Sequence, residues 1–255
     1  MELFEMKSNS RLKYEHSESV HNTQASEILV PYILSLLDPK SVLDVGCGIG
    51  TWLHVFRNYG VKDVFGIDGG YIDKSLLSKY LPPDCFQDVD LECSFDLGRK
   101  FDMVLSLEVA EHLSINAARE YVSSLCLHAD IVVFSAAVPG QDGQNHLNEQ
   151  WPKYWIDIFN SHGFEVFDPF RRIFWNDSRI DPWYRQNLFL FSRLNLNLDK
   201  PFISDIILPD YWGQKTKKLA RLKDNLERIR DGKVGFFFYL KGLFKSLKYL
   251  GRKVR

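Results

Sequence analysis

The stretch VLDVGCGIGTW, residues 42–52, decides the fold. Three glycines alternate in it, at Gly46, Gly48 and Gly50, directly after an apolar run that carries one acid, Asp44. An apolar strand that runs into alternating glycines and then into a helix presents backbone N–H groups at a helix N-terminus, where a nucleotide-like ligand can approach closely. The stretch predicts a strand–turn–helix unit with a ligand site. A tight turn without a ligand is the alternative interpretation.

Apolar runs of strand length alternate with helical patterns through much of the chain, and this alternation predicts a parallel sheet in an α/β fold. A helix is expected at Gln24–Leu37, and others fit between the strands, for example at Ala117–Leu127. A further helical run starts at Trp151 and stops at Gly163. The expected strands are Ser41–Val45, Val64–Ile67, Cys85–Phe86, Phe101–Ser106, Ile131–Ala136, Glu165–Asp168 and Asn187–Leu194.

The charge of the chain is unevenly distributed. With 255 residues, 45% of them hydrophobic, the chain can bury a sizeable core, as one domain with or without an extension. The formal net charge is −1, but residues 211–255 carry +11 and residues 1–210 carry −12. We therefore expect a domain at 1–210 and an extension at 211–255. The negative domain argues against nucleic acid as the main substrate, because phosphate binding depends on Lys and Arg.

Cysteine usage and the N-terminal sequence indicate the compartment. The four cysteines form no C-x-x-C pair, and the N-terminal residues lack the apolar core of a signal peptide. No uninterrupted apolar run approaches the ~20 residues that a membrane-spanning helix needs. We expect a reducing, cytosolic protein that does not cross a bilayer.

The glycine spacing favours one class of nucleotide-like ligand. Dinucleotide sites use G-x-G-x-x-G/A, which wants a small residue where this chain has Thr51. G-x-G-x-G behind an acidic strand end instead resembles motif I of class I S-adenosylmethionine-dependent methyltransferases, with Asp44 in the acidic position. This resemblance implies S-adenosylmethionine as cofactor and a Rossmann-like fold. Such a fold has a mostly parallel seven-stranded sheet with helices on both faces, here followed by the C-terminal helical extension.

Further motifs follow in the order that this family has. Asp68 ends the next strand, 18 residues past Gly50, close to the ~20 at which an acid meets ribose hydroxyls in such folds. It could instead cap a helix. In DVDLE, Asp90 and Leu91 match the family's adenine-binding positions, although Asp90 could be a solvated loop acid. In FDMVLSLEVAEHL, Leu107 matches the residue that flanks the cofactor.

Two other segments resemble a narrower group. NHLNEQWPKYW, residues 145–155, and WYRQNLFLF, residues 183–191, are similar to bacterial methyltransferases associated with surface-polysaccharide synthesis. This resemblance implies a sugar hydroxyl as acceptor, on a nucleotide-activated sugar or on a lipid-linked glycan. Three alternatives stay open: a methyltransferase of a small non-sugar metabolite, a nucleotide-binding oxidoreductase, and a non-catalytic, membrane-tethered binding protein.

A sugar hydroxyl has to lose its proton during methyl transfer, and histidine is the commonest general base. We expect His146, in a polar loop after the fifth strand, to serve as the base, although it could only cap a helix or bind substrate. We give His112 a structural or cofactor-side role. Glu149, Glu111 and Asp142 are alternative bases or ligands of a divalent metal. Because no motif with metal-ligand spacing is present, we expect metal independence.

The segment from Pro169 to Gln186 is too long for a tight hairpin, and we expect it to lie over a pocket. Aromatic side chains there could stack on sugars and arginines could pair with a diphosphate. Core packing and solvated surface are the ordinary alternatives. The residues concerned are Trp151, Trp155, Trp175 and Trp183, and Arg171, Arg172, Arg179 and Arg185.

The C-terminal residues predict an amphipathic helix. Spaced about 100° apart around a helix, one face collects Phe236, Leu240, Leu243, Leu247 and Leu250, and the opposite face collects Lys241, Lys245, Lys248 and Arg252. Such a helix is typical of peripheral binding to an anionic membrane, here the inner face of the cell membrane through residues 232–255. Alternatively the apolar face packs on the body or on a second subunit, with 214–230 as a connecting or dimerising helix.

Overall fold

The computed structural model describes residues 17–18, 21–201 and 203–253, with side chains as far as Leu247. The chain divides between Leu208 and Pro209 into two compact units. The first unit contains the glycine-rich stretch and all the predicted strands. Each unit is described by itself.

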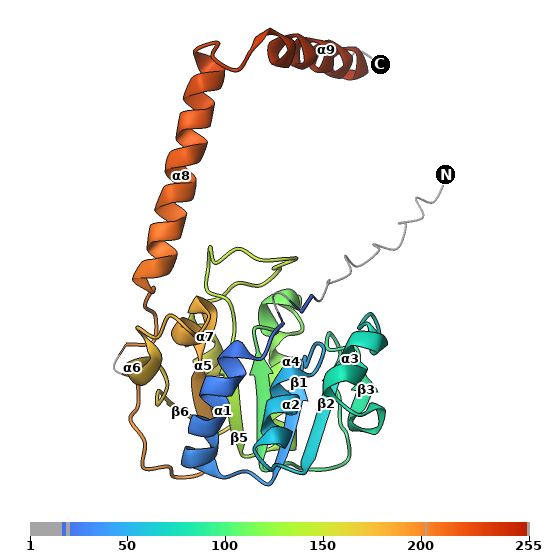
Figure 1. The fold of residues 1–255 in the computed structure, drawn as a ribbon, viewed down its shortest axis with the longest axis vertical. Helices are drawn as coiled ribbons and strands as arrows, with labels where there is room; N and C mark the ends of the chain where they lie inside the picture. Colours follow the sequence, from blue (N-terminus) through green and yellow to red (C-terminus); the bar gives the residue numbers. More distant parts are fainter. Residues whose placement is uncertain (1–16, 19–20, 202, 254–255) are drawn as a thin grey trace. The chain divides into compact units, whose positions relative to one another are not determined.

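The first unit is built on one seven-stranded sheet (Figure 1). Its strands are β1 Ser41–Val45, β2 Asp63–Asp68, β3 Phe86–Asp88, β4 Met103–Leu107, β5 Ile131–Ser135, β6 Glu165–Phe167 and β7 Phe189–Ser192. Their order is β3-β2-β1-β4-β5-β7-β6, and β7 alone runs antiparallel to its neighbours β5 and β6. The predicted mostly parallel, seven-stranded α/β sheet is therefore confirmed.

Helices cover both faces of this sheet (Figure 1). They are α1 Gln24–Leu37, α2 Thr51–Asn58, α3 Lys74–Tyr80, α4 Ala118–His128, α5 Pro152–Ser161, α6 Arg171–Phe174 and α7 Pro182–Asn187, with short 3₁₀ turns η1 Pro83–Cys85 and η2 Ala110–His112. One hydrophobic cluster contains residues of α1, α2, α3 and α6, and the other contains residues of α4 and α5. The two clusters are the cores on the two sides of the sheet.

Alternating residues of the central strands contribute side chains to these two cores. In β1, Val42 belongs to one cluster, and Leu43 and Val45 belong to the other. In β4, Met103 and Leu105 pack on the first side and Val104 on the second. Since side chains alternate across a strand, a strand buried on both faces reads as a continuous apolar run. This is why the sequence pattern located the central strands.

The order of the strands creates the place for a ligand. The sheet grows outward from β1 through β2 and β3 in one direction, and from β4 onward in the other. At such a reversal the connections after the two central strands leave on opposite faces, and a crevice opens at the carboxyl ends of the strands. The glycine loop after β1 and the turn after β4 leave the sheet at this reversal.

β1 has the expected bounds, and each of the other six strands differs from its expected range by one or two residues at one or both ends. Phe101 lies outside β4, because its N–H donates to the carbonyl of His128 and the next residue, Asp102, accepts from the backbone of Lys40 and Ser41. Asn187 ends α7 and does not open β7. In both cases a polar contact from a distant part of the chain ends the regular pairing.

Residues 169–186 fold into α6 and α7, and two of the arginines there are buried. Arg171 donates to Asp168 and to the carbonyls of Ser204 and Ile203. Arg185 donates in the same way to main-chain carbonyls within its own segment. The expectation that these two arginines pair with a diphosphate is wrong, because their donors hold loops together inside the protein.

Trp155 also has a structural position. Its side chain is 2% exposed and packs on Phe134 in the core. The expectation that Trp155 could stack on a sugar is therefore wrong. Trp151, three residues after Asn148, is 38% exposed and keeps a face available.

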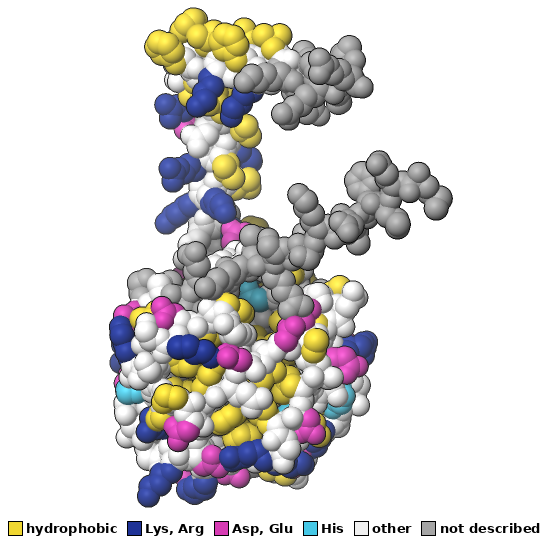
Figure 2. Space-filling model, turned by 90° about the vertical axis from the view of Figure 1, so that its right-hand side faces the viewer, with side chains coloured by type: hydrophobic (Ala, Val, Ile, Leu, Met, Phe, Trp, Pro, Cys, Tyr) yellow, Lys and Arg dark blue, Asp and Glu magenta, His cyan; other side chains and the backbone are white. Residues whose placement is uncertain are grey.

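The second unit consists of two helices, α8 Pro209–Arg230 and α9 Phe236–Lys253. Figure 2 shows hydrophobic side chains gathered along one side of α9. Exposed apolar residues there include Phe236, Phe237, Leu243, Phe244 and Leu247. The predicted contributions of Lys248, Leu250 and Arg252 lie outside the described side chains. Among the described residues, no helix combines the length and hydropathy needed to span a bilayer.

We predict that neighbouring arginines differ sharply in their contribution to stability. Arg171→Met should lower the free energy of unfolding by about 3 kcal/mol, because it removes one partner of a buried ion pair. Arg172, paired with Asp199 on the surface, is the matched control, and Arg172→Met should change it by less than about 1 kcal/mol. Urea unfolding measures both, and equal effects would contradict the structural role of Arg171.

Candidate active site

The glycine loop after β1 is a turn with left-handed backbone. Gly46, Gly48 and Gly50 have φ angles of 82°, 54° and 84°. A Cβ on Gly46 would lie 2.4 Å from a methyl group of Val109, in the turn after β4, and one on Gly50 would lie 3.0 Å from the Cβ of Leu81. Conformation and close packing therefore both require glycine at Gly46 and Gly50.

The N–H groups of the three glycines already have partners inside the protein. Gly46 donates to the carbonyl of Ile67, Gly48 to the carboxylate of Asp68, and Gly50 to the carbonyl of Cys47. These three N–H groups therefore stabilise the turn itself. The glycines supply a narrow turn without side chains, across which a ligand can lie.

Asp68, at the end of β2, fixes the loop. One carboxylate oxygen accepts the Gly48 N–H at 2.8 Å, and the other accepts the Gly69 N–H at 2.6 Å and the Tyr71 hydroxyl at 2.9 Å. The N-cap of the following helix is Asp73, which accepts from two backbone N–H groups of its first turn. Capping by Asp68, the alternative interpretation of its position, is therefore excluded.

Asp44 and Asp68 form a pair of buried acids beside the loop. Each is 3% exposed. Burial, and then the nearby Asp68 carboxylate, raises the pKa of Asp44 to about 8. Burial likewise raises the pKa of Asp68 against the opposing effect of its hydrogen bonds. A bound cation would offset this desolvation, so the two acids suit a positively charged ligand.

The remaining residues predicted to contact the cofactor follow the carboxyl ends of β3 and β4. Asp90 is exposed and accepts from the N–H of Glu92. Leu91 and Leu107 are buried, 7% and 9% exposed. Thus Asp44, Gly46, Gly48, Gly50, Asp68, Asp90, Leu91 and Leu107 all lie at or just beyond the carboxyl ends of four adjacent strands.

The turn after β4 contains an acid that the sequence motifs did not single out. Glu108 adopts a φ of 55°, which is uncommon for a residue with a side chain and concentrates at functional sites. Its carboxylate accepts from Gln141 at 2.7 Å and from Asn187 at 3.1 Å. Burial raises its pKa, against these hydrogen bonds. Its position directly after Leu107 was the only sequence signal.

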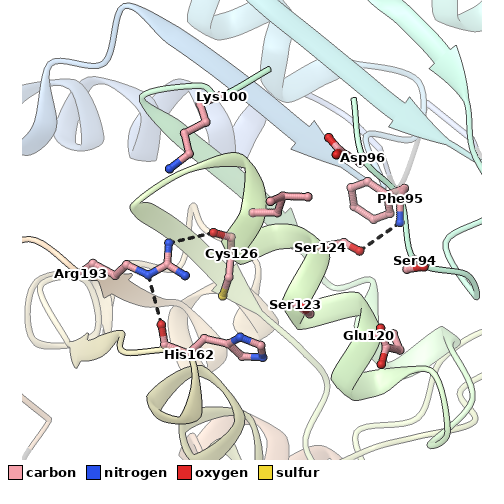
Figure 3. A pocket seen from close by; sticks show the side chains of 11 residues that line it. Ser94, Phe95, Asp96, Lys100, Glu120, Ser123, Ser124, Cys126, His162 and Arg193 are labelled. Carbon is pink, nitrogen blue, oxygen red and sulfur yellow. Dashed lines mark hydrogen bonds between the residues drawn. The ribbon is translucent and has the colours of Figure 1, made fainter. Parts of the chain in front are cut away.

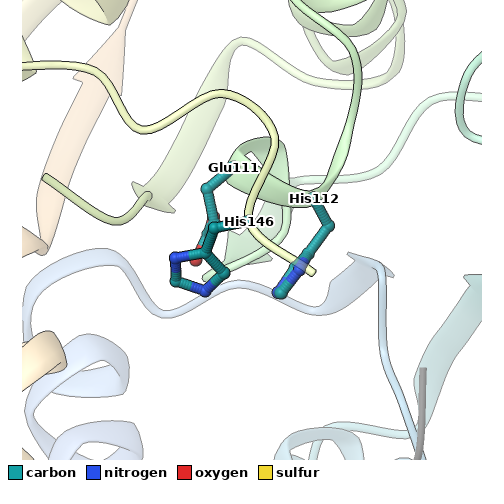
Figure 4. Close-up of side chains that lie close together, drawn as sticks. All are labelled: Glu111, His112 and His146. Carbon is teal, nitrogen blue, oxygen red and sulfur yellow. The ribbon is translucent and has the colours of Figure 1, made fainter. Parts of the chain in front are cut away.

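The same turn meets the loop that carries His146 (Figure 4). The carbonyl of Glu111 accepts from the N–H groups of Leu147 and Asn148, at 2.8 and 3.0 Å. The rings of His112 and His146 lie edge to face, 4.8 Å between centroids. Burial and then His146 lower the pKa of His112 to about 4, which keeps that imidazole neutral at neutral pH.

Glu149 organises the His146 loop. One oxygen lies 2.8 Å from Nδ1 of His146 and 3.1 Å from the N–H of Asp142, and the other accepts from Gly140. A neutral His146 ring that donates from Nδ1 to this carboxylate keeps its lone pair on Nε2. His146 lies in the polar loop after β5, as expected, and its side chain, 11% exposed, is held in place there.

A separate hollow of 520 Å³ lies away from this group (Figure 3). It is lined by the segment that leads into β4, the C-terminal half of α4 and Arg193. Arg193 bridges it by donating to the carbonyls of Cys126 and His162. These segments lie at the amino ends of the parallel strands, whereas ligands of such sheets bind at the carboxyl ends. The hollow is therefore not the site.

Comparison with known proteins identifies the family. Residues 21–169, more than half of the chain, match the model of a methyltransferase domain. The chain belongs to this methyltransferase family. The predictions of a methyltransferase and of S-adenosylmethionine as its cofactor are thereby confirmed. The match spans β1 to β6 and includes the glycine loop, the turn after β4 and the His146 loop.

Individual relatives are distant. The tRNA U34 carboxymethyltransferase of Campylobacter hominis is 30% identical over 112 residues, which are 42% of this chain and 39% of that protein. The sugar N-methyltransferase KedS8 of Streptoalloteichus is 16% identical, with a TM-score of 0.54 over 74% of this chain and 98% of its own. The amino pentose methyltransferase CalS10 of Micromonospora echinaspora is 17% identical, with a TM-score of 0.53 over 72% of this chain and 98% of its own. The two structures confirm the fold.

We predict that the loop cannot accept a side chain at Gly46. Gly46→Ala combines backbone strain with overlap on Val109, whereas Gly60→Ala, also at positive φ, meets nothing within 4 Å. Gly46→Ala should therefore lose about 2 kcal/mol more in free energy of unfolding than Gly60→Ala, the penalty of overpacking. Thermal and urea unfolding measure the difference, and two equally stable variants would refute the packing argument.

Proposed function

We propose that the protein transfers a methyl group from S-adenosylmethionine to a sugar hydroxyl, on a nucleotide-activated sugar or a lipid-linked glycan, in bacterial surface-polysaccharide synthesis. The supporting observation is the pairing of two groups at one edge of the sheet. Buried acids line the glycine loop after β1, and a histidine held by a carboxylate lies above the neighbouring turn after β4. A cationic methyl donor fits the first group, and an acceptor that must lose a proton fits the second.

The cofactor would lie across the glycine loop. Asp44 would face the ammonium and sulfonium charges, and the Asp68 oxygen that accepts from Gly48 would use its second lone pair to accept from a ribose hydroxyl. Asp90 and Leu91 would meet the adenine, with Leu107 against its other side. Because the buried acids are costly without a cation, binding of this cofactor would relieve their desolvation.

The acceptor hydroxyl would lie on the His146 side of the crevice. Methyl transfer is an in-line displacement: the acceptor oxygen bonds to the methyl carbon while the carbon–sulfur pair returns to sulfur, which becomes neutral. An amine acceptor has its own lone pair, whereas a hydroxyl must lose its proton. The lone pair on Nε2 of His146, set by the proton that Nδ1 shares with Glu149, suits that task and favours a hydroxyl.

Several observations favour a sugar over nucleic acid as the acceptor. The curated relative acts on tRNA, but residues 1–210 of this chain carry a net charge of −12, which repels phosphate backbones. Two proteins of the same fold, KedS8 and CalS10, are methyltransferases of sugars. Trp151, exposed at the start of α5, offers an aromatic face of the kind on which sugars stack.

We expect the purified protein to transfer labelled methyl from S-adenosylmethionine to at least one member of a nucleotide-sugar and lipid-linked-glycan panel. His146→Ala should lower kcat by about 10²–10⁴-fold, the usual contribution of hydroxyl activation. His162→Ala, remote at the amino ends of the strands, is the control and should retain full rate. S-adenosylhomocysteine binding without label on any glycan would reject the sugar acceptor.

We also propose that α9 holds the protein on an anionic membrane surface, where lipid-linked glycans occur. Its exposed apolar residues cluster on one side, and Lys241 and Lys245 are exposed on the other. An interfacial helix of this kind gains from apolar burial and from attraction to anionic lipid. Charge also supports this proposal, because residues 211–255 carry a net charge of +11.

Liposome flotation tests this tether. The full chain should float with vesicles containing anionic phospholipid and stay behind with neutral vesicles, whereas a chain that ends at Asp231 should stay behind with both. Lys241→Glu combined with Lys245→Glu keeps the apolar side and should reduce flotation. Equal recovery of the full and shortened chains in the unbound fraction would overturn the tether, and a halved solution mass on shortening would assign the apolar face to a second copy.

A further inference from the structure

Three side chains with metal-binding atoms converge where the turn after β4 meets the His146 loop. Glu111 and His112 come from η2, and His146 comes from a loop more than thirty positions later (Figure 4). One ligand atom of each lies within 4.8 Å of the others. The group contains one carboxylate and two imidazoles, and sequence spacing did not reveal it because the third ligand is remote.

Glu111 gives independent reason to look for a ligand. Its side chain is 1% exposed, and among the described residues neither carboxylate oxygen has a hydrogen-bond partner of normal geometry. Backbone N–H groups of Glu111 and Ala137 offset only part of the rise in pKa that burial causes. A buried carboxylate with so little compensation is strongly unfavourable, and proteins rarely keep one without a function.

We propose that Glu111, His112 and His146 bind a divalent first-row transition-metal ion. Two imidazoles and one carboxylate are a ligand set of such ions, whereas Mg²⁺ prefers oxygen ligands alone. With metal–ligand bonds of about 2.1 Å, ligands of a tetrahedral ion lie about 3.4 Å apart. The distances between the three ligand atoms would therefore shorten by about 1.4 Å at most, a movement that side-chain rotation supplies.

The surroundings hold these ligands in place. The carbonyl of Glu111 accepts from Leu147 and Asn148, which fastens the His146 loop over the turn. The carboxylate of Glu149 lies 2.8 Å from Nδ1 of His146. A carboxylate that holds the outer nitrogen of a histidine, leaving the other nitrogen for a metal, is a recurrent second layer of metal sites.

This inference rests on the proposed function and deepens it. Three protein ligands leave positions for substrate, and a hydroxyl bound there becomes more acidic. The acceptor O–H would lose its proton to solvent, the oxygen would bond to the methyl carbon, and the carbon–sulfur electron pair would stay on sulfur. His146 would then act as a ligand and not as the proton acceptor, and metal independence, expected from sequence, would be replaced by metal dependence.

Metal binding can be measured without any acceptor. Metal-free full-length protein should bind about one equivalent of Zn²⁺, Mn²⁺ or Co²⁺ by titration calorimetry and elemental analysis, and Mg²⁺ far more weakly. Glu111→Gln, His112→Asn and His146→Asn should each lower affinity at least ~100-fold. Glu149→Gln should lower it ~10–100-fold. His54→Asn and His162→Asn, histidines outside the group, should bind as the wild type does.

A second measurement separates the effect of a substitution on folding from its effect on metal binding. Glu111→Gln removes a buried charge and keeps its shape, so the metal-free variant should melt no lower than the wild type, while losing the rise in melting temperature that metal gives. Co²⁺ should produce visible absorption bands that disappear in each ligand variant. Wild type and ligand variants with equal affinity, or no binding at all, would overturn the site.

The metal site and the proposed function can fail separately. Methyl transfer to a glycan that persists in excess chelator, with no metal bound, overturns the metal site and leaves the function standing. One equivalent of metal bound through the three ligands, with no glycan methylated, overturns the sugar acceptor and supports the site. Transfer that stops with chelator and returns with Zn²⁺, Mn²⁺ or Co²⁺ supports both.

Discussion

The close approach of Val109 to the bare α-carbon of Gly46 sets the geometry of the site. A Cβ at that position would fall 2.4 Å from a valine methyl group. The contact joins the loop after β1 to the turn after β4, which diverge from neighbouring strands at the point where the strand order reverses. Because the two segments pack directly on each other, the proposed cofactor on one would lie within reach of the proposed acceptor on the other.

Three buried acids and one partly buried acid, Glu108, lie at this contact. Asp44 and Asp68 flank the glycine loop, and Glu108 and Glu111 belong to the turn after β4. Burial raises the pKa of each. A sheet edge that was only structural would gain stability from apolar residues at these positions. Bound cations offset the cost of this desolvation. The ligands proposed for the glycine loop and for the turn after β4, a sulfonium cofactor and a divalent ion, are both cationic.

The second unit has a different physical character. Residues 211–255 are basic, and α8 and α9 leave most of their apolar side chains exposed, which a folded domain avoids unless something covers them. The acidic methyltransferase unit and this basic extension therefore suit different partners. The proposed partners fit this division: a sugar acceptor for the acidic unit and an anionic lipid surface for the basic extension. A lipid-linked glycan would bring the two partners together.

The sequence by itself determined the sheet, the glycine turn and the family, because these depend on local pattern: apolar runs, backbone freedom at Gly46, Gly48 and Gly50, and an acid at a strand end. Contacts between distant segments needed the tertiary structure. Arg171 and Arg185 resembled phosphate ligands until their carbonyl partners were visible. Glu111, His112 and His146 became one group only when the later loop folded over the turn, since a side chain's partners depend on which segments the core brings together.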